Sequence, residues 1–350
     1  MKEDTQFGAL DKLGDEKLLK NIRRWTDHKR RTEKFTTYLN NYFYHLGAEA
    51  SLKEIRLRDQ IPRVEECGSY LLLRNYFLKN ETRLVGANFC SKHTLCGLCA
   101  IRRANKGSKN LHDKAHQVLA DNPSLNAYYV VLTVKNESNL ACGMRKLKNG
   151  WKRMRNIRNY ATEAKKRVKP GKSKYASALD SQFADVVAGA YSIEVTWGKE
   201  ENSNLKTYNP HMNLLVLSET KISEGKLSKE WKTYTGDSFI TKCQEVDLEE
   251  DTWAFCEIMK YAMKFSELPF KRHKEAYLTL LGQRLKGSIG DFRGVDLDPD
   301  PADEVLEGEP FIEILLSYFN GEYQETRERR AGVGTIKKRP KWVPSDLLPN

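Results

Sequence analysis

The sequence predicts an α+β protein in which a ferredoxin-like antiparallel sheet carries helices on one face. Two observations lead to this class. Between residues 128 and 265, segments with the two-residue period of strands alternate with segments of helical period. Their order is β-α-β-β-α-β-α, which fits the split β-α-β arrangement. At 350 residues the chain can bury at least one good core, and its length also fits two domains.

Each predicted element of this region has its own signal. Residues 128–134 read YYVVLTV, which favours a strand. A helical stripe from Leu140 to Met154 follows, and Pro170-Gly171 marks a loop. Further strands are predicted at 191–197, 211–217 and 239–246, with a short helix at 227–231 and a helix at 253–265.

The flanking segments differ from this region in composition. Residues 1–60 read as charged helices, and residues 61–108 hold a cluster of cysteines. The sheet domain is expected at 109–295. Residues 296–310 are acidic and contain proline, which predicts a flexible linker. An apolar helix at 311–319 and a basic tail complete the predicted C-terminal segment, 296–350.

The positive charge of the chain is concentrated in one block. The whole sequence has a formal net charge of +12, yet residues 100–175 alone contain 19 Lys and Arg against 4 Asp and Glu. Such a block suits a polyanion, although a solvated helix face would produce the same pattern. No signal peptide and no apolar run near the length of a membrane span is found, so we expect a cytoplasmic protein without a membrane partner.

Seven cysteines in such a chain indicate metal ligands or buried thiols rather than structural disulfides. Cys96-Gly-Leu-Cys99 forms a tight knuckle, and Cys67 and Cys90 could complete a tetrahedral structural Zn²⁺ site, with His93 in reserve. A redox Cys-x-x-Cys is the alternative, but no thioredoxin-like β-α-β pattern surrounds it. The other three are expected to be buried thiols: Cys142, Cys243 and Cys256.

A second candidate metal site lies on the predicted strands. His211 and Asn213 are two residues apart and therefore share a face of their strand. Glu194 lies on the polar face of the preceding strand and could add a carboxylate, which hard divalent ions prefer. Taken alone, a histidine that caps a strand and a turn asparagine beside Pro210 explain the same residues.

The predicted helix at 253–265 carries a candidate nucleophile. Glu257, Tyr261 and Lys264 share one side of this helix. A tyrosine with its usual pKa of about 10 is a poor nucleophile at neutral pH, and a nearby cation would favour the phenolate. The alternative is a surface helix with an ion pair and an amphipathic tyrosine.

Taken together and in order, these segments resemble the replication initiators of small rolling-circle plasmids, which belong to the HUH endonuclease superfamily. The resemblance covers about residues 62–294. In that family the metal motif is usually His-hydrophobe-His, and Asn213 stands here in place of the second histidine. The resemblance also indicates the branch in which a single tyrosine, matched by Tyr261, has a glutamate partner one turn earlier, matched by Glu257. It rests on five stretches: 66–99 with its cysteines, 132–134, 193–196, 209–213 and 257–264.

The resemblance implies a mechanism and partners. Mg²⁺ or Mn²⁺ held by His211, Asn213 and Glu194 would assist attack by Tyr261 on one strand of a plasmid origin, single-stranded or in a hairpin. A 5′-phosphotyrosine and a 3′-OH primer would result, and Glu257 would activate water for the closing cleavage. The DNA backbone would be bound by Lys264 and by a basic helix, through Arg145, Lys148, Lys152, Arg155 and Arg158.

Host helicase and polymerase are further implied partners, and the oligomeric state stays open. Two other functions also fit parts of the sequence. One is a transposase or relaxase of the same superfamily. The other is a zinc-containing DNA-binding regulator without catalysis, which explains the cysteines and the basic block but not the occurrence of His211, Asn213, Glu257 and Tyr261 together.

Overall fold

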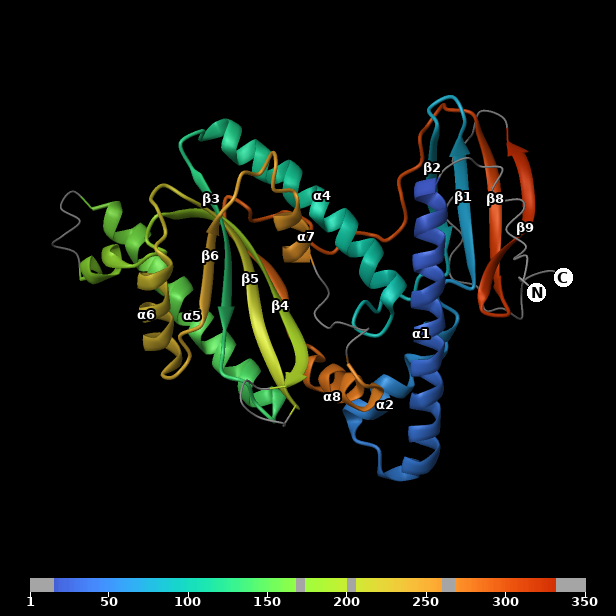
Figure 1. Cartoon of the computed structure of the whole chain (residues 1–350), viewed down its shortest axis with the longest axis horizontal. Coiled ribbons are helices and arrows are strands. Elements are labelled where there is room, and N and C mark those ends of the chain that lie inside the picture. The colour runs from blue at the N-terminus through green and yellow to red at the C-terminus, as the bar shows by residue number, and fades with distance from the viewer. Residues whose placement is uncertain (1–15, 168–173, 200–205, 260–267, 332–350) are drawn as a thin grey trace. The chain divides into compact units, whose positions relative to one another are not determined.

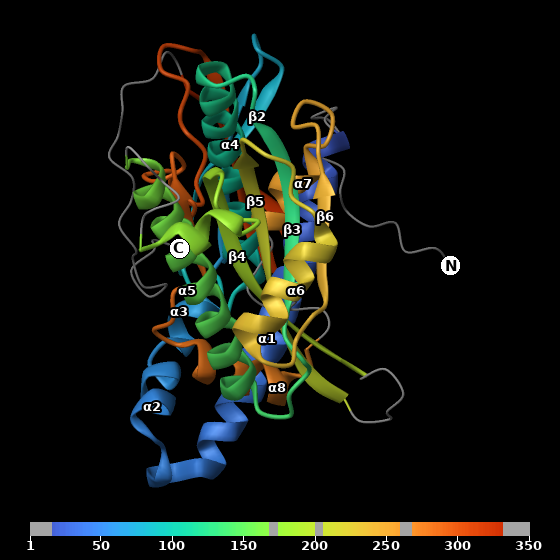
Figure 2. The same ribbon diagram turned by 90° about the vertical axis from the view of Figure 1, so that its left-hand side faces the viewer.

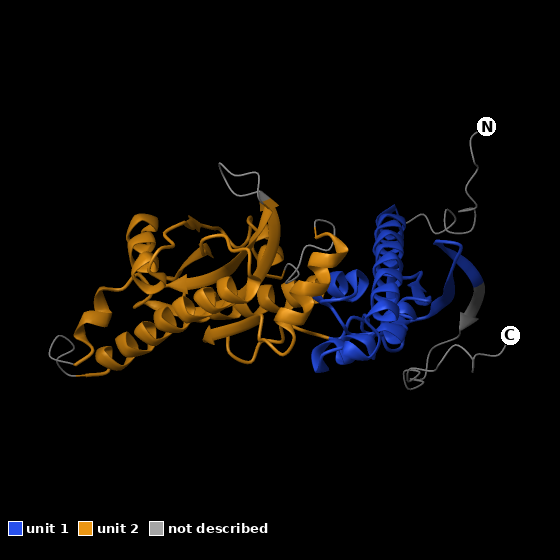
Figure 3. Ribbon diagram, turned by 90° about the horizontal axis from the view of Figure 1, so that it is seen from below, with its two compact units in different colours: residues 1–103, 300–350 blue, residues 104–299 orange. Residues whose placement is uncertain are grey.

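The chain divides into two compact units (Figure 3). The computed structural model describes residues 16–167, 174–199, 206–259 and 268–331. Unit 1 consists of residues 1–103 and 300–350, and unit 2 consists of residues 104–299. Unit 1 is thus assembled from both ends of the chain.

Unit 1 contains a four-stranded antiparallel sheet in the order β2-β1-β8-β9. Its long helix α1 buries Leu18, Ile22 and Trp25, which have the helical spacing seen in the sequence. Contacts with the hairpin of β8 and β9 hold α1 in place, because the Tyr318 hydroxyl donates to Glu33 at 3.0 Å. The elements of unit 1 are α1 (Glu16–Leu46), a 3₁₀ turn η2 (Gly47–Glu49), α2 (Leu52–Arg58), α3 (Ile61–Glu65), β1 (Tyr70–Tyr76), β2 (Glu81–Ala87), β8 (Phe311–Phe319), β9 (Glu322–Ala331) and the first turns of α4 (Gly97–Asp121).

The predicted helix at 311–319 is wrong, because this segment is strand β8. Its backbone groups bond to β1, more than 230 residues earlier, and to β9. A local apolar pattern cannot reveal a partner so distant in sequence. The local signal that could have corrected the prediction is Asn320-Gly321, where both residues have positive φ (48° and 85°) and close the hairpin of β8 and β9.

The expected linker at 296–310 makes specific contacts within unit 1. Asp303 accepts hydrogen bonds from Arg102 Nη2 at 2.5 Å and from the backbone of Leu84 at 2.9 Å. Arg102 is 9 % exposed and also donates to the Pro301 carbonyl at 3.0 Å. These contacts hold the segment just before β8 against β2 and the first turns of α4.

Unit 2 is built around a five-stranded antiparallel sheet in the order β6-β3-β5-β4-β7 (Figure 1). The run β3-α5-β4-β5-α6-β6-α7 has the element order expected from the sequence. The elements of unit 2, besides the rest of α4, are β3 (Asn126–Thr133), α5 (Leu140–Lys165), a 3₁₀ turn η4 (Ala176–Asp180), β4 (Val186–Lys199), β5 (Lys206–Ser218), α6 (Glu224–Thr235), β6 (Thr241–Glu245), α7 (Trp253–Met259), α8 (Phe270–Leu280) and β7 (Lys286–Gly290).

Helices cover both faces of this sheet, and not one face as expected. Helices α5 and α6 lie in front of the strands in Figure 2, and Trp151 of α5 packs on Tyr191 of β4 with ring centroids 5.2 Å apart. On the other face, Leu111 of α4 and Phe255 of α7 share a core with Leu215 of β5. Strand residues alternate between these two cores, which explains why β4 and β5 are apolar on more than one face.

The helices in the described ranges are too short or too polar for a membrane span, which needs about 20 predominantly apolar residues.

The contact between α5 and α6 leads to a stability prediction. A Cβ added at Gly150 would lie 2.7 Å from the ring of Trp231, which is fully buried and donates to the Thr133 carbonyl at 2.7 Å. We expect overpacking to cost Gly150→Ala about 1–3 kcal/mol and the gain in helix propensity to offset about 1 kcal/mol of this cost, so the variant should melt below one that has the propensity gain alone. Thermal melting measures the effect.

The matched control is Gly225→Ala in α6, where no atom lies within 4 Å of the added Cβ. This variant is expected to melt at or above the wild-type temperature, since only the gain in helix propensity remains. Gly150→Ala melting as high as Gly225→Ala would contradict the packing described here.

Candidate functional site

Three polar side chains meet on the sheet face that α4 and α7 cover. In the pairing of β4 with β5, Glu194 lies opposite His211, and Ser192 lies opposite Asn213. Directly opposed residues of an antiparallel pair share a face. His211 Nε2 is 3.1 Å from Glu194 Oε2, and Asn213 Nδ2 donates to the same oxygen at 3.3 Å. The three residues that the sequence selected as a metal site are therefore neighbours.

The pair formed by His211 and Glu194 suits a divalent cation. His211 Nδ1 is 3.3 Å from the carbonyl of Asn209, and a proton on Nδ1 directed there would leave Nε2 of the neutral ring as an acceptor. Two acceptors 3.1 Å apart then need a proton or a cation between them. Adjacent ligands on one Mg²⁺ ion, with bonds of about 2.1 Å, are separated by about 3 Å. The two donors thus have the separation that such an ion requires.

Asn213 has a different position in this network. Its side-chain oxygen accepts a hydrogen bond from the Tyr129 hydroxyl at 3.0 Å, so its nitrogen faces Glu194. A half-turn of the amide would exchange these atoms. The Tyr129 hydroxyl could then accept instead of donate. Asn213 as a metal ligand stays a prediction, since in the observed orientation it acts as a donor that holds the Glu194 carboxylate.

Helix α7 lies on the same face of the sheet. Its core residues pack against β4 and β5, and Trp253 contacts the Tyr129 ring edge-on, with centroids 5.1 Å apart. Burial raises the pKa of Tyr129 far above its usual value, and the negative charges of Glu257 and Glu194 add to the rise. Glu257 is thus close enough to act electrostatically on the centre of the cluster. Tyr261 and Lys264 lie outside the described residues.

Sequence reasoning missed Tyr129. It identified residues 128–134 only as a strand, because alternating β-formers look alike whether their polar tips are used or not. What places Tyr129 in the cluster is the register of β3 against β5, which no local sequence pattern shows: Tyr129 pairs with Leu215 and therefore shares the face of Asn213.

The basic helix α5 lies on the face opposite to His211 and Glu194. Trp151 of this helix belongs to the core, since it is 5 % exposed and packs on Phe183 and Tyr191. The Arg158 side chain is bound inside unit 2 and is therefore not free to contact DNA. It donates to the carbonyls of Val186 at 2.7 Å and Val187 at 2.9 Å. Of the other four basic residues predicted to bind DNA, Arg145 and Lys152 are exposed, and Lys148 and Arg155 are half-buried.

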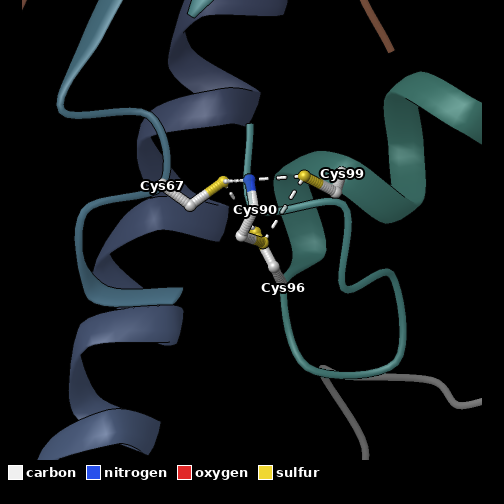
Figure 4. A group of neighbouring side chains, drawn as sticks. All are labelled: Cys67, Cys90, Cys96 and Cys99. Atoms are coloured by element: carbon white, nitrogen blue, oxygen red, sulfur yellow. Dashed lines mark hydrogen bonds between the residues drawn. The ribbon is translucent and has the colours of Figure 1, made fainter. Parts of the chain in front are cut away.

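Four cysteines form a buried cluster in unit 1 (Figure 4). Cys67 follows α3, Cys90 follows β2, and Cys96 and Cys99 flank the first residues of α4. Their sulfur atoms all lie within 4.8 Å of one another. Three of the sulfur pairs are 3.5–3.6 Å apart. The Gly68 turn beside them, with φ of 70°, is held by the Tyr323 hydroxyl at 2.8 Å from the Gly68 carbonyl oxygen.

This cluster could hold a metal ion such as zinc. Tetrahedral Zn²⁺ with bonds of about 2.3 Å places its sulfur ligands about 3.8 Å apart, close to the separations found. All four cysteine residues are at most 1 % exposed. Hydrogen bonding from Cys67 lowers the pKa of the Cys96 thiol, and hydrogen bonding with Cys90 raises the pKa of the Cys67 thiol. A divalent cation would allow all four to ionise together.

The remaining cysteine predictions are partly wrong. Cys142 and Cys256 are exposed, and Cys243 is half-buried, so two of the three expected buried thiols face solvent. His93 is not in the metal-binding group found among the described residues, and its Nδ1 lies 3.3 Å from Arg103.

Comparisons with known proteins give one distant relative. The chain is 24 % identical over 334 residues to a protein named Protein rep from Streptococcus pneumoniae serotype 2, strain D39, and the match covers 93 % of this chain and 82 % of that protein. No model of a protein family matches the chain, and no solved structure matches it.

We expect replacement of Cys96 and Cys99 by serine to lower bound zinc and stability together. Structural zinc contributes roughly 10–16 kcal/mol in small peptide domains, so loss of two thiolates should unfold at least unit 1. Elemental analysis should give one zinc per wild-type chain. Cys142→Ser is the matched control, because this exposed thiol is outside the cluster and its loss should leave the zinc content unchanged. A folded wild type without metal would disprove the prediction.

Proposed function

We propose that this chain is a replication initiator that nicks one strand of DNA at a plasmid origin through a tyrosine nucleophile. The observation that carries the proposal is the meeting of His211, Glu194 and Asn213 on one sheet face, below the helix of Glu257. Tyr261 follows Glu257 by four residues in sequence.

Two further observations support this proposal. The strand order β6-β3-β5-β4 corresponds to 4-1-3-2 in chain order, as in a ferredoxin-like fold of the kind that HUH endonucleases have. The relative named Protein rep matches along most of both chains, and its name agrees with a replication initiator.

The first chemical step would be an exchange of phosphodiester bonds. The Tyr261 oxygen attacks the scissile phosphorus, the bond from phosphorus to the 3′ oxygen breaks, and the phenolic proton is finally transferred to that oxygen. A 5′-phosphotyrosine and a free 3′-OH result. His211 and Glu194 would hold the Mg²⁺ or Mn²⁺ ion, which when bound neutralises charge on a non-bridging phosphate oxygen. Lys264 would favour the phenolate form of Tyr261.

Asn213 would orient the Glu194 carboxylate through the hydrogen bond observed, or bind the ion after a half-turn of its amide. In either orientation the Tyr129 hydroxyl can satisfy the outer atom of the amide. With either orientation, an amide in the position of the second histidine would keep both of its own polar atoms paired, which supports this proposed role.

Glu257 would act in the closing step. Its carboxylate would activate a water molecule that attacks the second phosphodiester, so the cycle ends in hydrolysis instead of passing the strand to a second tyrosine.

Origin DNA, single-stranded or in a hairpin at the nick, is the proposed substrate. Host polymerase would extend the 3′-OH, and host helicase would unwind the duplex ahead of it.

Incubation with a supercoiled plasmid carrying the cognate origin and Mg²⁺ or Mn²⁺ tests the proposal. We expect a nicked product and a covalent adduct on a denaturing gel. Tyr261→Phe should lower nicking by more than about 10³-fold, since the nucleophilic oxygen is lost, while origin binding is kept. Tyr160→Phe, which removes the hydroxyl of an exposed tyrosine on α5, is the control and should nick normally.

The outcome also separates the alternatives. A DNA-binding regulator without catalysis would give binding but no adduct with any variant. A transposase or relaxase of the same superfamily would give an adduct on its own element or transfer origin and not on a plasmid replication origin.

Glu257→Ala should separate the two chemical steps. First-strand nicking does not require the carboxylate and should survive. The closing cleavage should slow by about 10²–10⁴-fold, the usual contribution of a general base, and products longer than one plasmid unit should accumulate. Glu250→Ala, at an exposed position just before α7, is the control. Loss of nicking in Glu257→Ala would instead assign the carboxylate to metal binding or to structure.

A further inference from the structure

The cations of helix α5 fall into two groups. Residues 140–166 contain nine Lys and Arg, and five of them are bound to partners within unit 2. These are Lys146 with Glu137 and Asp237, Arg153 with the Tyr234 carbonyl, Arg158 with the carbonyls of Val186 and Val187, Lys165 with Asp185 and Glu219, and Lys166 with Glu163.

The other four form what we call the cationic stripe: Arg145, Lys148, Lys152 and Arg155. They follow one another at intervals of three, four and three residues, so they lie along one side of the helix. Within the described part of the chain, none of the four has a hydrogen-bond or ion-pair partner. At 100° per residue, the stripe lies on the flank away from Lys146 and Arg153, which are bound to residues of α6 and the turn after it.

The stripe is electrostatically uncompensated. Lys148 is half-buried, and burial lowers the pKa of its ammonium group without any acidic neighbour that opposes the effect. Holding such a charge costs desolvation that no internal partner returns. An anion bound along the stripe would remove this cost. The paired cations of the same helix offer no such gain, because their carboxylates and carbonyls are already in place.

The dimensions and composition of the stripe select among polyanions. From residue 145 to residue 155 it rises about 15 Å, which matches about four phosphates of one strand at 3.4 Å each along a B-DNA axis. Surfaces that bind single strands usually add exposed aromatic rings for base stacking. The only aromatic residue between the ends of the stripe, Trp151, is buried in the core. The stripe is thus suited to phosphates alone.

We propose that the cationic stripe binds the phosphate backbone of double-stranded DNA, on the face of the sheet opposite to His211 and Glu194. Combined with the proposed function, the inference assigns duplex DNA to one face of the sheet and the nicked, unpaired stretch to the other face. This inference rests on the proposed function only in taking DNA as the polyanion. It also restricts the DNA contacts of α5 to four of the five residues that the sequence indicated, since Arg158 is bound within the fold.

Fluorescence anisotropy of the full chain with a labelled duplex of about 20 base pairs, and with one of its strands alone, tests the proposal over a salt titration. The slope of log K against log salt should fall by about 2 for the duplex when Lys148→Gln and Lys152→Gln are combined, about 1 for each lost phosphate contact. Glutamine preserves helix propensity, and thermal melting confirms folding. The slope for the single strand should change much less.

The matched control combines Lys226→Gln with Lys229→Gln. These lysines are exposed on α6 and three residues apart, and their replacement changes the net charge equally. For this control variant, the slope of log K against log salt with the duplex should stay within about 0.5 of the wild-type value. A duplex slope unchanged in the stripe variant, an equal loss for the single strand, or an equal loss in the control would overturn the proposal. Binding to vesicles of anionic lipid is measured in parallel. A stripe variant that loses binding only to these vesicles, and not to the duplex, would also overturn the proposal.

The test separates this inference from the proposed function. A chain that binds duplex through the stripe but never forms a covalent adduct would retain the inference and reject nicking. A chain that nicks while the stripe variant keeps the wild-type duplex slope would do the reverse.

Discussion

The register between β4 and β5 is the constraint on which the candidate site depends. It places Glu194 opposite His211 and Ser192 opposite Asn213, and a slip of one residue would move these side chains to the other face of the sheet. The register is itself fixed from that other face. Tyr191, Ile193, Val195, Met212 and Leu214 are all buried there, and each contributes about 1.5–3 kcal/mol through burial.

The polar cluster is therefore positioned largely by an apolar core that it does not touch. A hydrogen-bonded cluster alone would be a weak determinant, because each such bond contributes only about 1 kcal/mol net. The core under α5 supplies the larger energy, and Trp151 is central to it through its contacts with Phe183 and Tyr191. This division explains why α5 matters for the site even though it lies on the opposite face.

Much of unit 2 was predictable because its signals are local. Periodicity located β3, α5, β4 and β5, and spacing placed His211 and Asn213 on one side of a strand. The pairing of Glu194 with His211 followed from treating the two strands as a hairpin. The role of Tyr129 could not be predicted in this way, because it depends on the register between β3 and β5, which are about 80 residues apart.

The fold of unit 1 was harder to predict from the sequence, again because its strands pair across a long sequence separation. Its sheet pairs β1 with β8, more than 230 residues later. Each of these strands has a hairpin partner on one side only, and its other neighbour is distant in sequence. The cysteine spacing predicted the metal cluster, but nothing in the spacing indicated the sheet. The separation of paired from unpaired cations on α5 also needed the structure, since Glu137, Asp185, Glu219 and Asp237 come from other segments.

The pairing of β1 with β8 has a consequence for biosynthesis. Strands β1 and β2 and all four cysteines of the cluster leave the ribosome before unit 2, whereas β8 and β9 follow it. One edge of β1 therefore stays unpaired while about 200 residues are translated. An unpaired strand edge can form non-native pairs with other strands. A metal ion bound early by the four cysteines would stabilise the N-terminal part of unit 1 during translation. Tyr323 is synthesised later, and its hydroxyl then binds the Gly68 carbonyl oxygen.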